Sequence, residues 1–118
     1  MSRQRLEIRV TDATREAAAE GLRVDVYCLG RRAAKLCSAK VGPQGTLQDP
    51  VLTSEAIRPG EYEVVFHVAE FYRRCGVAVP PIPSLDAVPF RFGISAEPGP
   101  CTLPVRVSPS SFAVEVLK

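Results

Sequence analysis

The chain contains a single histidine, and imidazole is the one side chain whose ordinary pKa lies near neutrality. His67 lies within residues 61–68, where polar and apolar side chains alternate. Alternation places it on the face opposite the apolar residues, so we expect a solvated side chain beside Glu63 or Glu70. No Ser-His-Asp or Cys-His pattern surrounds it in the sequence. A catalytic role would therefore need partners that only the fold could bring to it.

Four cysteines are the remaining candidates for nucleophilic or metal chemistry. They lie far apart and form no C-x-x-C pair: Cys28, Cys37, Cys75 and Cys101. This spacing argues against a zinc ribbon and against a dithiol redox motif. We expect reduced thiols that act as small buried apolar side chains, with a Cys28–Cys37 pair across a hairpin as the alternative. We expect neither a metal nor another cofactor.

Length and charge limit the domain organisation and the partners. With 118 residues the chain suits one domain, over residues 1–118. The formal net charge of +2 is too small for a sequence-independent hold on nucleic acid or on an anionic membrane. No run approaches the roughly 20 apolar residues of a membrane helix, and the first residues form no apolar signal core. We expect a cytoplasmic protein without nucleic-acid or membrane partners.

Eleven prolines and eight glycines separate short stretches in which apolar and polar residues alternate. This pattern is typical of a β-sandwich. The predicted strands cover residues 6–11, 22–28, 36–41, 61–68, 88–95, 102–107 and 112–117, and a short helix is expected over 69–75. The sequence therefore predicts an all-β fold of seven or eight strands in two packed sheets, with one short helix.

The last predicted strand carries apolar side chains on both faces. Phe112, Val114 and Val116 share one face, whereas Ala113 and Leu117 share the other. Such a strand needs cover on both sides, and an uncovered edge of this composition would invite aggregation. We therefore predict an oligomer.

Three segments carry a family resemblance. The stretch G-E-Y-E-V-V-F at residues 60–66 runs into F-Y-R-R at 71–74, V-P-F-R-F follows at 88–92, and L-P-V-R-V-S-P lies at 103–109. Their order and spacing resemble the 5-hydroxyisourate hydrolase and transthyretin family over nearly the whole chain. The resemblance implies a transthyretin-like sandwich, a homodimer or homotetramer, and a small-molecule channel between the subunits.

The chain departs from the hydrolase motifs of that family at several positions. Arg9 stands at the histidine of T-H-V-L-D, Thr46 at the arginine of D-G-R, and Thr102 at the second histidine of H-Y-H-V-P. The terminal Y-R-G-S is absent. The resemblance implies that Arg9, Thr46 and Thr102 surround one pocket, and Arg106 is a further candidate for binding a substrate there.

Hydrolysis needs a base that takes a proton from water and cations that hold the developing negative charge. Threonine cannot be that base, so Arg9, Thr46 and Thr102 leave the pocket without a proton acceptor. We therefore do not expect an ordinary 5-hydroxyisourate hydrolase. We expect a repurposed enzyme that acts on a small anionic metabolite in the channel, with Arg9 as its electrostatic clamp and the threonine hydroxyls as hydrogen-bonding groups.

Two alternatives stay open. The chain could be a non-catalytic small-molecule binding or scaffolding protein of transthyretin type, because a fold by itself does not determine function. Arg9 could instead point outward and pair with Glu7, Asp12 or Glu115 across neighbouring strands. The sequence therefore does not decide whether the protein is an enzyme.

Overall fold

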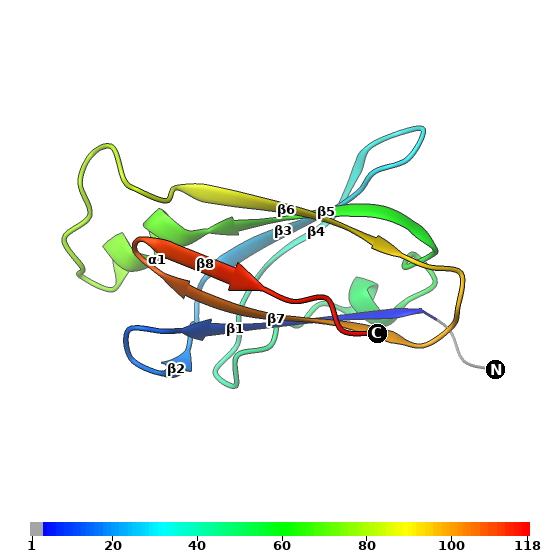
Figure 1. Ribbon diagram of the computed structural model, residues 1–118, viewed down its shortest axis with the longest axis horizontal. Coiled ribbons are helices and arrows are strands. Elements are labelled where there is room, and N and C mark those ends of the chain that lie inside the picture. The colour runs from blue at the N-terminus through cyan, green and yellow to red at the C-terminus, as the bar shows by residue number, and fades with distance from the viewer. Residues whose placement is uncertain (1–3) are drawn as a thin grey trace.

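Two four-stranded β-sheets pack face to face in the computed structural model, which describes residues 4–118 (Figure 1). The first sheet has the strand order β2-β1-β7-β8, with β1 at Arg5–Asp12, β2 at Ala17–Ala18, β7 at Pro100–Ser108 and β8 at Ser111–Val114. The second sheet has the order β4-β3-β5-β6, with β3 at Arg23–Cys28, β4 at Ala34–Lys40, β5 at Gly60–His67 and β6 at Ala87–Ile94. A 3-10 helix, η1, covers Pro50–Thr53, and the α-helix α1 covers Val68–Arg74.

The predicted transthyretin-like sandwich with one short helix is confirmed, with eight strands. The predicted domain begins at residue 1, but residues 1–3 lie outside the described part.

The core lies between the two sheets and is built by strand alternation. On β1, Leu6, Ile8 and Val10 are buried, whereas Glu7 and Arg9 point to the outer face of the first sheet. Strand β7 runs parallel to β1, and its buried residues pair with those of β1 in register. Apolar side chains from both inner faces thereby form one continuous core, and the outward side chains of β1 and β7 lie side by side.

Helix α1 connects the two sheets at the end of the sandwich opposite the C-terminus (Figure 1). Its buried residue Tyr72 donates a hydrogen bond to Asp12 Oδ1 at 2.7 Å and also contacts the carbonyl oxygen of Val107 at 3.0 Å. Both acceptors belong to the first sheet. The helix predicted over 69–75 is confirmed, with its bounds shifted by one residue to 68–74. Because α1 directly follows β5 of the second sheet, the Tyr72 hydrogen bonds hold the second sheet against the first.

The C-terminal segment differs from its prediction. Strand β8 ends at Val114 instead of continuing to Leu117, and one further bridge pairs Leu117 with Thr102 of β7. Val116 and Leu117 are 41% and 48% exposed. The described residues therefore leave the apolar side chains at this end of the chain uncovered.

The cysteines follow their prediction only in part. Cys101 is buried and Cys28 and Cys37 are half-buried, but Cys75 at the end of α1 is exposed, so its predicted burial was wrong. In the β3–β4 ladder, Cys37 lies opposite Val26 and Cys28 opposite Ala34. The two cysteines are therefore not cross-strand neighbours. Neither helix in residues 4–118 is long and apolar enough to cross a membrane.

Candidate functional site

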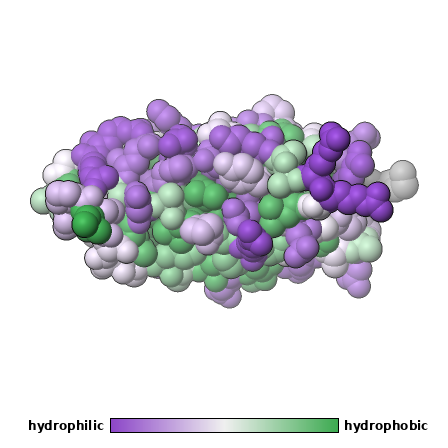
Figure 2. All heavy atoms as spheres, turned by 90° about the horizontal axis from the view of Figure 1, so that it is seen from above, coloured by the Kyte–Doolittle hydropathy of each residue, from purple (hydrophilic) through white to green (hydrophobic). Residues whose placement is uncertain are grey.

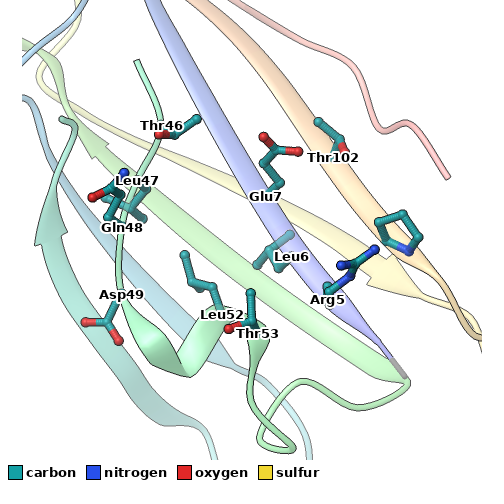
Figure 3. A pocket seen from close by; sticks show the side chains of 11 residues that line it. Arg5, Leu6, Glu7, Thr46, Leu47, Gln48, Asp49, Leu52, Thr53 and Thr102 are labelled. Atoms are coloured by element: carbon teal, nitrogen blue, oxygen red, sulfur yellow. The ribbon is translucent and has the colours of Figure 1, made fainter. Parts of the chain in front are cut away.

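A pocket of about 470 Å³ opens beside β1, between the outer face of the first sheet and the segment that leads into η1 (Figure 3). Its polar side chains come from β1, from β7 and from residues 46–53. Thr46 and Thr102 both line it, and we call it the Thr46–Thr102 pocket. The structure therefore brings together two of the four residues singled out in the sequence, although their roles there stay predictions.

A glycine turn places Thr46 in this pocket. Gly45 has a φ of +90°, a left-handed conformation that residues with a Cβ rarely adopt. Its carbonyl oxygen accepts a hydrogen bond from Val10 N–H at 2.8 Å, and Leu47 N–H donates to the carbonyl oxygen of Ile8 at 2.9 Å. These bonds hold residues 45–47 against β1, with Thr46 opposite Arg9.

Arg9 lies beside the pocket but does not line it. Its Nε donates to Glu7 Oε2 at 3.1 Å, and the two side chains are 56% and 45% exposed. This is the pairing with Glu7 that the sequence left as an alternative. Because exposed ion pairs of this kind are weak, the guanidinium is available to another anion that reaches the pocket rim.

Arg106 lies apart from the Thr46–Thr102 pocket. Its side chain pairs with Glu16 at 2.6 Å, and this contact lowers the pKa of the Glu16 carboxyl. It borders a smaller hollow of about 130 Å³ together with Pro104 and Glu115. Arg106 and the Thr46–Thr102 pocket lie on the same outer face of the first sheet, but the Arg106 side chain does not line that pocket.

Glu7 is a pocket residue that sequence reasoning missed. The β1–β7 register places Glu7 beside Thr102, and in Figure 3 its carboxylate lies between Thr46 and Thr102. The sequence interpretation considered Glu7 only as a partner for Arg9. The inference that the pocket lacks a proton acceptor was therefore wrong, because a carboxylate can accept one. The alternation of buried and exposed residues along β1 is enough to place Glu7 on the outer face of the first sheet. Its neighbours there depend on the register between β1 and β7.

Arg5, Gln48, Asp49 and Thr53 complete the polar lining. Arg5 projects from the start of β1 on the same side as Glu7 (Figure 3). One carboxylate oxygen of Asp49 accepts the Val51 N–H at 2.9 Å and so caps η1. The pocket thus offers a guanidinium, an amide, three hydroxyls and two carboxylates. The Asp49 carboxylate and the Thr53 hydroxyl are engaged in hydrogen bonds of the η1 segment.

His67 is not the solvated side chain that we expected. It lies on the outer face of the second sheet, but its side chain is only 18% exposed, and Nε2 lies 2.8 Å from Asp25 Oδ2. Arg23 Nη2 lies 3.4 Å from Nδ1. Burial by itself would raise the pKa of Asp25, but hydrogen bonds with Ser38 and His67 outweigh it and lower that pKa. The expectation of a solvated histidine was therefore wrong, because Asp25 of β3 holds the ring. The expected neighbourhood of Glu70 is confirmed, since His67 and Glu70 line the same hollow.

The pocket therefore contains no imidazole, since the only histidine of the chain lies on the other sheet. Within residues 4–118 there is also no group of three His, Cys, Asp or Glu side chains that could hold a metal ion. The side chains that this chain contributes to the pocket are carboxylates, a guanidinium, an amide and hydroxyls.

Comparisons with known proteins agree on one family. The model of the HIUase/transthyretin family matches residues 6–114. A 5-hydroxyisourate hydrolase of Pseudomonas aeruginosa is 31% identical over 110 residues, which cover 92% of this chain and 87% of that protein. The 5-hydroxyisourate hydrolase 2 of Rhizobium meliloti is also 31% identical, over 92% of both chains.

Solved structures show the same fold. A crystal structure of (S)-allantoin synthase superposes with a TM-score of 0.89 at 27% identity, over 99% of this chain but 44% of that longer chain. The 5-hydroxyisourate hydrolase of Klebsiella pneumoniae superposes over the full length of both chains, with a TM-score of 0.77 at 20% identity.

Proposed function

Because the chain belongs to the HIUase/transthyretin family, we propose that it is a divergent, hydroxyisourate hydrolase-like enzyme, which acts on a small anionic metabolite in the Thr46–Thr102 pocket. One observation carries the proposal. The pocket offers three threonine hydroxyls and no imidazole, while His67 is bound to Asp25 on the other sheet. A reaction that depends on an imidazole base is not available to this set of side chains.

The cations of the site suit an anionic ligand. Arg5 lines the pocket, and Arg9 stands at its rim in an exposed contact with Glu7. A guanidinium can hold a carboxylate or an enolate by two parallel hydrogen bonds. The hydroxyls of Thr46 and Thr102, on either side of Glu7, can then orient the ligand (Figure 3).

The proposal includes a second copy of the chain, in a homodimer or a homotetramer. The pocket opens on the outer face of the first sheet, near the exposed Val116 and Leu117. Seen from the side of the second sheet, the surface of the molecule mixes hydrophilic and hydrophobic side chains, with the hydrophobic ones gathered toward one long edge (Figure 2). A subunit packed against this sheet would turn the open pocket into part of a channel.

A second candidate function is binding without catalysis. Leu47, Leu52 and Pro100 line the same pocket as the polar groups. Apolar walls with a few oriented polar groups are typical of small-molecule binding sites. This lining favours a carrier, which would bind the same ligand and release it unchanged.

The decay of 5-hydroxyisourate, followed by absorbance with and without purified protein, tests the proposal. We expect no acceleration over buffer, together with binding of small carboxylates or of urate, a stable planar anion. Arg9→Ala should weaken that binding by about tenfold or more, as expected for loss of a charged hydrogen-bond donor.

Arg91→Ala is the matched control, because Arg91 pairs with Glu63 at 2.7 Å on the second sheet, away from the pocket. It should bind like the wild type. Acceleration of 5-hydroxyisourate decay that is lost in Arg9→Ala would overturn the proposal in favour of a genuine 5-hydroxyisourate hydrolase. Binding without turnover of any bound anion would favour the carrier.

A further inference from the structure

We infer that the ligand of the Thr46–Thr102 pocket is dipolar. Beside its anionic group it carries a cationic nitrogen group, such as an ammonium or a guanidinium, and Glu7 binds this cation. The inference rests on the proposed function, and it narrows the small anionic metabolites to carboxylates that also bear a positive charge. Amino acids and guanidino acids have this chemistry.

The charged side chains that line the pocket do not suit a ligand that is only an anion. They are one guanidinium, that of Arg5, and two carboxylates, those of Glu7 and Asp49. Arg9 stands at the rim and is shared with Glu7, with 3.1 Å between Arg9 Nε and Glu7 Oε2. Binding surfaces place opposite charges together and keep like charges apart. This lining is therefore more complementary to a ligand with both signs of charge.

Strand β1 presents charges of alternating sign on its outer face. Arg5, Glu7 and Arg9 occupy every second position of β1, and the alternation of a strand turns all three to the same side. Neighbouring Cα atoms of this row are about 7 Å apart, which is twice the rise per residue of a strand. Because Glu7 lies between the two arginines, an anionic group bound to either guanidinium leaves the adjoining part of the ligand beside the Glu7 carboxylate.

The Glu7 carboxylate can accept a further hydrogen bond. Its Oε2 accepts from Arg9, whereas Oε1 has no hydrogen-bond partner among residues 4–118. The carboxylate lies between Thr46 and Thr102, so its neighbours on the pocket side are hydroxyls (Figure 3). An ionised carboxylate only accepts hydrogen bonds, so the ligand must donate there. A cationic donor makes the strongest bond of this kind.

Arg5 is the matching cation for the anionic group. It lines the pocket, and it forms no ion pair within the part of the chain that the structure describes. In Figure 3 it projects from the start of β1 on the same side as Glu7. Its guanidinium can hold a carboxylate by two parallel hydrogen bonds. A ligand with its two charges separated by a few methylene groups would then contact Arg5 and Glu7 together.

Matched pairs of ligands test the charge of the nitrogen group. The acids 4-guanidinobutyrate and 4-ureidobutyrate share their carboxylate and their size, but only the first carries a cation. A second pair, 3-guanidinopropionate and 3-ureidopropionate, covers a shorter separation of the two charges. Isothermal titration calorimetry at pH 7 and low salt gives the dissociation constant of each acid. We expect the guanidino acid to bind about tenfold more tightly in at least one pair, because a hydrogen bond between two charged groups is stronger than one with a neutral donor.

Glu7→Gln assigns this preference to Glu7. The variant keeps the size of the side chain and removes its charge, so the tenfold advantage of the guanidino acid should disappear. Glu63→Gln removes the carboxylate of a similar pair with Arg91 on the second sheet, and it should keep the wild-type preference. Arg5→Ala should weaken both acids of a pair by a similar factor, since they share the carboxylate. If Glu7 only held Arg9 in place, Glu7→Gln would change both affinities and leave their ratio as it is.

The outcomes distinguish the dipolar ligand from the proposed function. If the ureido acids or urate bind and the guanidino acids have no advantage, the dipolar ligand is refuted and the proposed anion site stands. The same holds if Glu7→Gln keeps the wild-type preference. If the wild type binds neither urate nor any of these carboxylates, the proposed function is overturned, and the dipolar ligand with it. Thermal unfolding of each variant shows that the fold is intact.

Discussion

The side chain of Asp12 illustrates how a single residue can bind distant parts of this fold. Asp12 is only 1% exposed, yet it accepts hydrogen bonds from Thr14, Arg15 and Tyr72. Burial by itself would raise the pKa of Asp12, but these hydrogen bonds outweigh it and lower that pKa. Burial and the neighbouring Asp12 raise the pKa of Tyr72, which keeps its phenol protonated as a donor. The ionised carboxylate is thus the form that the folded protein needs.

Tyr72→Phe should destabilise the protein by about 2 kcal/mol at pH 7, because it removes a donor from a buried carboxylate. Urea unfolding followed by circular dichroism measures this difference. Tyr27→Phe is the matched control, since Tyr27 is half-buried and its hydroxyl has no hydrogen-bond partner among residues 4–118. Equal stability of Tyr72→Phe and the wild type would contradict the assignment of this contact.

The same contact predicts a dependence on pH. A carboxyl whose pKa is lower in the folded than in the unfolded state contributes stability above the unfolded pKa, and this contribution is lost as the pH falls through the folded pKa. The unfolded value of an aspartate is about 3.9. The loss in free energy of unfolding caused by Tyr72→Phe should therefore be full at pH 7 and should shrink below about pH 4. Unfolding curves of the variant and the wild type at several pH values measure this dependence. A deficit that does not change with pH would mean that the lost hydrogen bond does not depend on the charge of Asp12.

At the level of the elements, the turn at Gly45 decides where Thr46 lies. A Cβ at this position would lie 3.4 Å from the carbonyl oxygen of Val10 and 3.5 Å from the Cβ of Ala18. The positive φ is a stronger constraint than these contacts, because side chains with a Cβ are strained there. The residues that follow this turn, Thr46 and Leu47, form one wall of the pocket.

Gly45→Ala should destabilise the protein by about 1–2 kcal/mol, the usual cost of a left-handed conformation for a residue with a Cβ. It should also weaken urate binding, because Thr46 is held by the same turn. Thermal or urea unfolding and calorimetry measure the two effects. Gly30→Ala is the control, since a Cβ there meets no atom within 4 Å and its φ is not positive. Gly45→Ala with unchanged stability would show that the turn relaxes freely.

At the level of the whole molecule, the exposed C-terminal apolar residues predict self-association. Light scattering on a size-exclusion column should give two or four times the chain mass of 12.8 kDa. Val116→Lys places a charge at a residue that is 41% exposed, so it should shift the protein towards the monomer without unfolding it. Ile82→Lys is the control, because Ile82 is 89% exposed on the loop after α1. A wild-type chain that runs as a monomer at every concentration would refute the oligomer.

Most of the fold could be predicted from local sequence pattern. Alternation with a period of two residues identifies a strand and its buried face, and Pro and Gly mark the turns. For this reason β1, β5 and α1 were predicted within one or two residues of their observed bounds. The last strand was predicted too long, because its apolar residues continue beyond Val114 although its regular pairing does not.

The composition of the site depended on tertiary structure. The sequence determined that His67 lies on the face opposite the apolar residues of its strand, since this depends only on alternation along the strand. It could not determine which outward side chains become neighbours, because the register between strands far apart in sequence is set by packing of the whole core. The parallel pairing of β1 with β7 placed Glu7 beside Thr102, and the pairing of β3 with β5 brought Asp25 within reach of His67. Tertiary structure alone thus gave the pocket a carboxylate and gave His67 a carboxylate partner on the other sheet.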